Sequence, residues 1–286
     1  MRFLSLIILI LYVQAYACDI IPNESLVSLS GPVSHFLFRL NLLNRPGIKA
    51  ISSHHGLGAN EFKGTLISGG LFMAPETLKS FSNSVVFFDE SRELSLNLKK
   101  RQPKKIFQVS TRNLDPFETT SKIREIVTPF LWQCEQELSI ERRQSENIRN
   151  EILSKTSVGN KRYVIFFLGR LEKGKRRPDL IMANDGFTMF LKKAGVIETY
   201  PTSLNYVVWS DSILKEIEKN KRPLLIGLVS EKKDATQSPL ETRFEEIEKG
   251  KIYNAWIPTG IIPGHPQMEF MKDFTTFIKD VPKESK

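Results

Sequence analysis

Histidines are the residues of this sequence best suited to hold a metal or to touch a metal complex. The chain has four of them, His35, His54, His55 and His265. His54 and His55 come in a Gly-rich segment after a predicted strand, and His265 comes in a predicted late loop. A zinc or manganese site needs further histidines or carboxylates at fixed positions, and the sequence offers no such pattern. Two interpretations of His54, His55 and His265 therefore remain open, contact with a chelated ligand and plain loop histidines, and we expect no metal site.

Basic residues crowd one short segment that resembles a phosphate-binding loop. The segment Gly169–Arg176, GRLEKGKR, has the Gly-x4-Gly-Lys spacing after a predicted strand. Arg176 stands where the magnesium-binding Ser or Thr belongs and Pro178 follows, so we expect no nucleotide site. Two interpretations of these charges remain open, an anion-binding rim and a solvated cluster.

Arginines that follow predicted strands are candidate ligand contacts. Arg112 and Arg170 both do so, which predicts that they lie near the floor of a ligand site. The guanidinium fork binds carboxylates in a bidentate manner, which lysine cannot do. The pair therefore favours an anionic ligand.

Two tryptophans are candidates for an aromatic wall. Trp209 and Trp256 follow apolar predicted strands, and a flat ligand face or core packing would each explain them. The sequence contains neither a Gly-x-Ser-x-Gly elbow nor a His-Glu-x-x-His motif. We expect a binding protein without a cofactor, and not an enzyme.

The beginning of the chain predicts export. Residues 1–17 combine a basic start, a short apolar core and a small-x-small end, which is typical of a secretory signal peptide. Removing them would lower the formal net charge of +9 by one and leave Cys18 first. A basic exported chain favours anionic partners other than nucleic acid. Export permits a disulfide between Cys18 and Cys134, while two free thiols or a lipidated Cys18 are the alternatives.

Short apolar runs alternate with amphipathic stretches along the rest of the chain. Predicted strands cover 26–29, 48–52, 84–88, 105–109, 163–168, 224–229 and 252–257. Predicted helices cover 33–43, 75–81, 92–100, 115–128, 187–191, 212–219, 240–248 and 267–278. This alternation predicts an α/β protein with mostly parallel sheets covered on both faces.

A long polar helix divides the pattern into two halves. The segment from Cys134 to Ser154 lacks Gly and Pro and has a thin apolar stripe. It predicts an N-terminal α/β lobe at 18–133, a linking helix at 134–156 and a C-terminal α/β lobe at 157–286, with a ligand cleft between the lobes. Ser30, at the Ser-Gly-Pro corner after the first predicted strand, would face that cleft, because ligands of open α/β sheets bind where strands end and helices begin. A tight turn without ligand contact is the other interpretation of this corner.

The order of these pieces resembles the class III periplasmic substrate-binding proteins of ABC importers. The resemblance rests on five segments: LVSLSGPVSHFLFRLNLLNRPGIKAIS, LISGGLFMAPETLKSFSNSVVFF, VSTRNLDPFETTSKIREI, KRYVIFFL and GFTMFLKKAGVIE. The resemblance covers nearly all of the chain after residue 17. One departure is Ser82-Asn83-Ser84, where the family usually has Lys-Pro-Asp.

The resemblance implies a periplasmic monomer that captures a metal chelate, such as a ferric siderophore, haem or cobalamin, and delivers it to an ABC permease. It also implies that an acidic residue on each lobe docks to the permease. Glu90 and Glu93 are the candidates in the first lobe, and Glu241 and Glu245, in a predicted helix, are those in the second. A free-metal receptor of the same fold class and a secreted α/β enzyme with an unrecognised site remain the alternatives.

Overall fold

The computed structural model describes thirteen stretches of the chain. They are residues 18–52, 62, 64–67, 81–89, 104–110, 114–156, 161–172, 175–204, 206–220, 223–229, 243–247, 252–256 and 265–280, with the backbone alone described at 168–172, 175–179, 243–247, 252–256 and 265–267, among others. The chain groups into two compact units, one made of residues 1–110 and 121–144 and the other of residues 111–120 and 145–286. The predicted domain limits stay a prediction.

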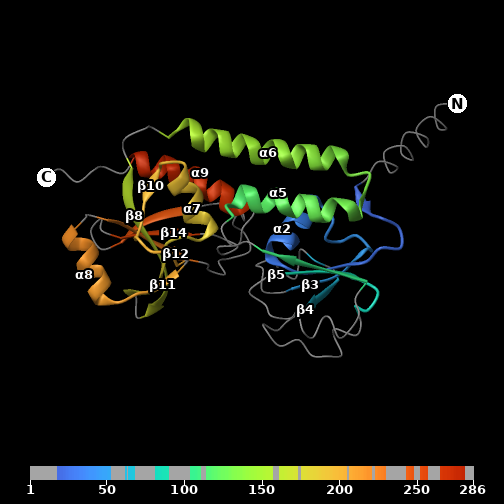
Figure 1. Ribbon diagram of the computed structural model, residues 1–286, viewed down its shortest axis with the longest axis horizontal. Helices are drawn as coiled ribbons and strands as arrows, with labels where there is room; N and C mark the ends of the chain where they lie inside the picture. The colour runs from blue at the N-terminus through green and yellow to red at the C-terminus, as the bar shows by residue number, and fades with distance from the viewer. Residues whose placement is uncertain are drawn as a thin grey trace. The chain divides into compact units, whose positions relative to one another are not determined.

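Unit 1 contains a five-stranded sheet in which every pairing is parallel, in the order β4-β3-β2-β5-β6 (Figure 1). Its strands are β2 Leu26–Leu29, β3 Ile48–Ser52, β4 Thr65–Ile67, β5 Val85–Asp89 and β6 Lys105–Val109, and α2 Gly31–Arg39 follows β2. Alternate residues of β5 pack in different hydrophobic clusters. Val85 and Phe87 belong to one cluster, and Val86 and Phe88 belong to another. The continuous apolar run of this strand therefore reflects burial of both sheet faces.

The start of unit 1 is fastened to the segment before the long helix. Strand β1, Asp19–Ile20, pairs antiparallel with β7, Leu131–Trp132, which follows the 3-10 turn Thr128–Phe130. A disulfide joins Cys18 to Cys134 with an S–S distance of 2.08 Å, and both cysteines are buried. The N-terminal strand is thus held by a ladder and a covalent bond.

Unit 2 contains a seven-stranded mixed sheet in the order β11-β9-β8-β12-β14-β13, with β10 beside β8. The strands are β8 Arg162–Glu172, β9 Lys175–Met182, β10 Ile197–Glu198, β11 Tyr206–Val208, β12 Leu224–Val229, β13 Arg243–Ile247 and β14 Ile252–Trp256. Its helices are α7 Gly186–Lys193, α8 Asp211–Asn220 and α9 His265–Asp280. Strands β8, β12 and β14 are parallel, whereas β9 and β13 run antiparallel to their neighbours.

The two faces of the unit 2 sheet carry separate cores. Helices α7 and α9 lie on one side of this sheet and α8 on the other (Figure 1). Val164 and Phe166 of β8 share a cluster with residues of α7 and α9, while Ile165 and Phe167 share one with Ile213 of α8. Phe166 and Phe274 of α9 are fully buried, with ring centroids 4.9 Å apart. This alternation along β8 explains why its sequence is an unbroken apolar run.

Helices α5, Pro116–Val127, and α6, Glu135–Ser154, contribute residues to both units. In unit 1 the buried Glu141 of α6 accepts from Arg39 of α2 at 2.9 Å and from the Nε of Arg124 of α5 at 2.8 Å. A buried carboxylate needs such partners, because an uncompensated charge is costly in the interior. These contacts fasten the first part of α6 to its unit.

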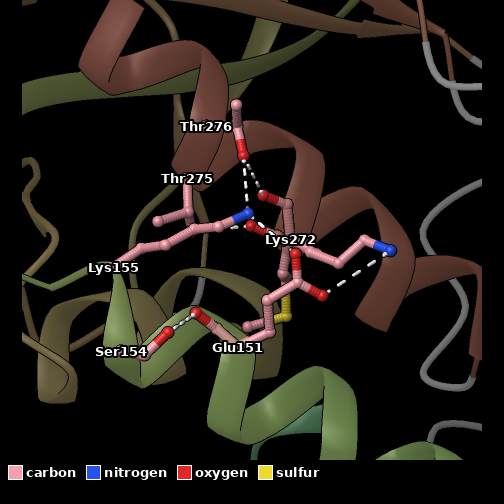
Figure 2. A network of polar contacts seen from close by, with 7 residues as sticks. Glu151, Ser154, Lys155, Lys272, Thr275 and Thr276 are labelled. Atoms are coloured by element: carbon pink, nitrogen blue, oxygen red, sulfur yellow. Dashed lines mark hydrogen bonds and ion pairs between the residues drawn. The ribbon is translucent and has the colours of Figure 1, made fainter.

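A second network fastens the end of α6 to α9 in unit 2, and Figure 2 shows it. Lys155 donates to Glu151 at 2.8 Å and to the Thr276 hydroxyl at 3.1 Å, while Lys272 lies 3.9 Å from Glu151. The hydrogen bond from Lys155 lowers the pKa of Glu151, and the Lys155 and Lys272 charges act in the same direction. Because Glu151 is 43% exposed, this network contributes little to stability.

Several sequence expectations differ from the structure. Residues 243–247, predicted as helix, form the strand β13, so Glu245 lies in a strand. The basic segment after Leu168 is not a loop, because β8 continues to Glu172 and pairs with β9. Arg170 therefore lies within β8, Trp256 is the last residue of β14, and His265 is the first residue of α9.

Candidate functional site

The first candidate position is the point in the unit 1 sheet where the strand order reverses. From β2 the chain continues to β3 on one side and later to β5 on the other, so the carboxyl ends of β2 and β5 flank the switch point. Asp89 ends β5, and Gly31 begins the helix after β2. The Gly31 N–H donates to Asp89 Oδ2 at 3.3 Å. Sequence reasoning missed Asp89, although a carboxylate at the end of the run SVVFFD was a visible signal.

The corner between β2 and α2 is stabilised by its own side chains. The Ser30 Oγ accepts from the Val33 N–H at 3.4 Å and caps the helix. The Ser28 hydroxyl donates to the Ser30 carbonyl at 2.9 Å, and the Ser34 N–H donates to the same carbonyl at 3.0 Å. Since Pro32 has no N–H, every backbone donor from Gly31 to Ser34 is accounted for.

These contacts change the interpretation of Ser30. The sequence predicts that this corner faces a ligand cleft. The structure shows Ser30 fully buried, and the Asp89 carboxylate already occupies the position at the helix start that an anion would favour. These hydrogen bonds support a capping role for Ser30, and its contact with a ligand stays a prediction.

The second candidate position is the carboxyl edge of the parallel strands of unit 2. Leu168 of β8 pairs with Leu228 of β12, and Ala255 of β14 pairs with Leu228 from the other side. Strands β12 and β14 end one residue later, at Val229 and Trp256. Only β8 continues, and it does so together with β9. The basic segment therefore rises from the edge of the sheet at which ligands of α/β proteins bind.

Trp209 lies beside this edge and packs on the sheet. It follows β11, is partly buried, and has its ring 5.6 Å from that of Phe167. It belongs to the same hydrophobic cluster as Ile165 and Ile213. The structure thus supports core packing for Trp209, and a ligand contact by it stays a prediction.

Strand β11 exposes apolar side chains at the side of the unit 2 sheet. Tyr206 is 44% exposed and Val208 is 72% exposed. Desolvation, with a smaller contribution from the Asp185 charge, raises the pKa of Tyr206 to about 12, so its hydroxyl is protonated at neutral pH. The side chain can donate a hydrogen bond there but cannot supply a phenolate.

Most of the predicted site residues fall where the structure describes no side chain, so their grouping stays a prediction. His54, His55, Arg112, Glu90, Glu93 and Glu241 lie outside the described residues. For Arg170, Glu245, Trp256 and His265 the backbone position is described and the side chain is not. Among the described residues, no group of three His, Cys, Asp or Glu side chains could hold a metal ion. Within the same part of the chain, no helix has the length and apolar character needed to cross a membrane.

Comparisons with known proteins place the chain by its fold. No protein-family model matches it, and no curated protein matches it by sequence. It is similar to an ABC transporter substrate-binding protein from Listeria monocytogenes, with 9% identity and a TM-score of 0.62, covering 89% of this chain and 98% of that chain. It is also similar to the periplasmic haem-binding protein RhuT from Roseiflexus, with 14% identity and a TM-score of 0.62 over 90% and 98% of the two chains.

A third similar structure binds a different ligand. It is the periplasmic vitamin B12-binding protein BtuF of Vibrio cholerae, with 9% identity and a TM-score of 0.61 over 90% of this chain and 97% of that chain. Identities this low show the fold alone, and the names of RhuT and BtuF specify different ligands. The chain has the two-lobe α/β fold of the class III periplasmic substrate-binding proteins.

Proposed function

We propose that this protein is the substrate-binding component of an ABC importer and captures a metal chelate, such as a ferric siderophore, haem or cobalamin. The observation that supports the proposal best is the extent of the structural similarity. The likeness covers 89–90% of this chain and 97–98% of the three binding proteins, so both lobes of that fold have counterparts here. Fold likeness of this extent favours binding and delivery over catalysis, while the ligand differs among the similar proteins.

We further propose that the protein works outside the cytoplasmic membrane. The signal-peptide pattern of residues 1–17 and the buried Cys18–Cys134 disulfide support this location, because disulfides persist in oxidising compartments. N-terminal sequencing of the exported protein should begin at Cys18. An uncleaved chain, or a diacylglyceryl group on Cys18, would contradict the proposed route.

The ligand is best identified from the protein itself. The exported protein should be purified gently and examined by native mass spectrometry and absorbance for a retained chelate. The emptied protein should then be titrated with haem, cobalamin, ferric hydroxamate and ferric citrate-type siderophores, and with bare nickel, zinc and manganese ions. We expect one chelate to bind at 1:1 stoichiometry with a Kd below about 1 μM, which corresponds to about 8 kcal/mol.

The other outcomes separate the alternatives. Tight binding of a bare metal ion, without affinity for any chelate, would favour a free-metal receptor. Chemical conversion of an added chelate would favour an enzyme. If none of the chelates binds, the proposed function is wrong.

A further inference from the structure

Strand β11 lies at one edge of the unit 2 sheet and carries exposed apolar side chains. It pairs with β9 through residues 206–208, and no other described strand lies on its second side. Tyr206 is 44% exposed and Val208 is 72% exposed, and both point to the same face because alternate residues of a strand do so. Leu204, just before the strand, is 59% exposed. An apolar edge of this kind can pair with a further strand.

The segment that contains β11 lacks the charges that usually protect a sheet edge. From Thr199 to Ser210 the sequence TYPTSLNYVVWS has no charged residue. Natural edge strands are often blocked by lysine, as at β6, where Lys104 and Lys105 are exposed. The chain has a formal net charge of +9, so two copies of it repel each other overall. An uncharged apolar edge is therefore a place where two copies can meet with little electrostatic cost.

Neighbouring groups of unit 2 hold this edge in one conformation. The Asn184 amide donates to the carbonyls of Thr202 and Leu204, the latter at 3.1 Å. The Asn184 Oδ1 accepts from Lys192 at 2.6 Å. On the other face of the strand, Val207 packs against the hydrophobic cluster on the α8 side of the sheet. A strand fixed in this way loses little conformational freedom when it pairs.

The side chains of β11 are complementary to those of a second β11. Two copies of an edge strand that are related by a two-fold axis pair antiparallel, and each contributes the same surface. With the axis at Val207, Tyr206 of one copy lies opposite Val208 of the other, and the symmetry repeats this pair. An aromatic residue opposite a β-branched residue is a favourable cross-strand pair, and no like charges face each other. The sequence of this strand therefore suits a symmetric partner.

We propose that β11 is the interface through which two copies of this protein associate, by antiparallel pairing of the strand with itself. The unit 2 sheets of the two copies then form one continuous sheet, with Tyr206 packed against Val208 at both ends of a short ladder. The association differs from the monomer that the family resemblance implies, and it does not depend on the identity of the ligand. Because β11 has only three residues, the contact is smaller than a standard stable interface, and we expect a Kd of about 10–500 μM.

Sedimentation velocity of the exported protein at increasing concentration tests the association. We expect monomers to convert to dimers, without larger species, as the concentration approaches about 1 mM, because a two-fold contact closes on itself. Raising the salt concentration should strengthen the dimer, since screening weakens the repulsion between two basic molecules. A protein that stays monomeric at about 1 mM overturns the inference. A dimer that salt dissociates also overturns it, because such a dimer depends on opposite charges.

Charge substitutions at the paired positions test the register. Val208→Glu and Tyr206→Lys should each weaken dimerisation about 10-fold or more, because each places a charge opposite an apolar side chain. The double variant Tyr206→Lys/Val208→Glu should recover association, since antiparallel pairing sets each lysine opposite a glutamate. Ile140→Glu, at a 46% exposed apolar position of α6, is the matched control and should dimerise like the wild type.

The remaining results would overturn the inference. A double variant that dimerises no better than the single variants contradicts antiparallel pairing, and an equal loss in Ile140→Glu contradicts the assignment to β11. A monomeric wild type whose Val208→Glu variant binds its chelate more weakly assigns the patch to the ligand site instead. A monomeric wild type whose variant keeps its affinity but loses uptake assigns it to the permease. The thermal midpoint of Val208→Glu should match that of the wild type, and a marked fall would show that this side chain supports the fold instead of an interface.

Discussion

Ser30 ends one element and starts the next, and its hydroxyl caps helix α2. The Oγ accepts from the Val33 N–H, and the backbone at Ser30 is extended, with φ −105° and ψ 127°, as expected for an N-cap residue. Ser28 and Ser34 complete a buried hydroxyl network, in which Ser34 Oγ lies 2.8 Å from Ser28 Oγ. Because these polar groups are hydrogen-bonded to one another, the corner is stable without a bound ligand.

Replacing Ser30 should therefore affect stability more than ligand binding. We expect Ser30→Ala to lower the free energy of unfolding by about 1 kcal/mol, and Ser30→Gly to lower it by only a few tenths, because glycine is tolerated at N-caps. Denaturant titration measures both changes. The Ser30→Ala protein should keep wild-type affinity for its ligand, and a loss of affinity without a loss of stability would instead assign Ser30 to the binding site.

Replacing Glu141 should lower the free energy of unfolding more than replacing Ser30. It is 3% exposed and is bonded by both Arg39 and Arg124. Glu141→Gln should lower the free energy of unfolding by about 3 kcal/mol or more, because it removes the negative charge that faces two poorly exposed guanidinium groups. Glu151→Gln is the matched control on the same helix and should cost less than about 1 kcal/mol, since that carboxylate is 43% exposed. Equal losses in denaturant titrations of the two variants would contradict this ranking.

Asp115 should make stability depend on pH. Its Oδ1 accepts from the Phe117 and Glu118 N–H groups at 2.8 and 2.9 Å, and burial raises its pKa above the ordinary value of 3.8. The folded state therefore holds this proton more tightly than the unfolded state, so the free energy of unfolding falls as the pH rises from 3.8 through the folded pKa.

Asparagine at this position keeps a capping oxygen and removes the charge. We expect the stability of Asp115→Asn relative to the wild type to improve as the pH rises above 3.8, because the buried wild-type carboxyl must then ionise in the folded state. Chemical denaturation at several pH values measures the difference. Asp211→Asn, at the exposed start of α8, is the control, and an identical profile for the two variants would contradict the role of burial.

At the scale of elements, the sequence predicts several strands in full. The strands 26–29, 105–109 and 224–229 are confirmed residue for residue. The first and the last lie inside their sheets, where burial of both faces favours an apolar run, whereas 105–109 lies at a sheet edge with Lys105 and Gln108 exposed. The helix predicted at 240–248 is wrong. Its Glu-rich sequence favours a helix locally, but antiparallel pairing with β14 makes residues 243–247 an edge strand.

The pairing of β8 with β9 beyond Leu168 and the contact of Asp89 with Gly31 could not be predicted for a similar reason. Pro178 and the run of charges indicated a loop, whereas pairing between β8 and β9 carries both strands past that proline. The contact between Gly31 and Asp89 joins residues 58 positions apart in the sequence. Hydrophobic periodicity indicates which side of a segment is buried, but it does not indicate which distant segment of the chain lies beside it.

The Cys18–Cys134 disulfide joins the same two segments of the chain that pair as β1 and β7. Cys18 and Cys134 are 116 residues apart, and closing so long a loop restricts the unfolded chain strongly. We expect a Cys18→Ser/Cys134→Ser protein to lose about 4 kcal/mol of unfolding free energy, although native disulfides range from about 2 to 5 kcal/mol. Denaturant titration gives the value, and non-reducing peptide mapping of the wild type should show the linked peptides. Free thiols at both positions would contradict the pairing.

At the scale of the whole molecule, the formal charge of +9 complicates any test of a charged interface. A basic protein gains or loses affinity for anionic partners through its overall field as well as through single contacts. Charge-reversal experiments therefore need a control with the same change in net charge. The helices of the two units provide one, because Glu125 of α5 and Glu216 of α8 are both exposed.

Docking to a permease is the prediction that involves both lobes at once. We expect Glu93, with Glu90 as its neighbour, and Glu241 to pair with permease arginines, so a Glu93→Arg/Glu241→Arg protein should lose uptake while keeping its ligand affinity. Glu125→Arg/Glu216→Arg changes the net charge equally and should transport normally. Uptake of labelled ligand into vesicles that carry the permease measures transport, and titration measures affinity. Exposed carboxylates usually contribute little alone, so the double reversal, which replaces attraction with repulsion at two points, is the informative variant. Wild-type uptake by the Glu93→Arg/Glu241→Arg protein, or an equal loss in the control, would show that these carboxylates are not the docking contacts.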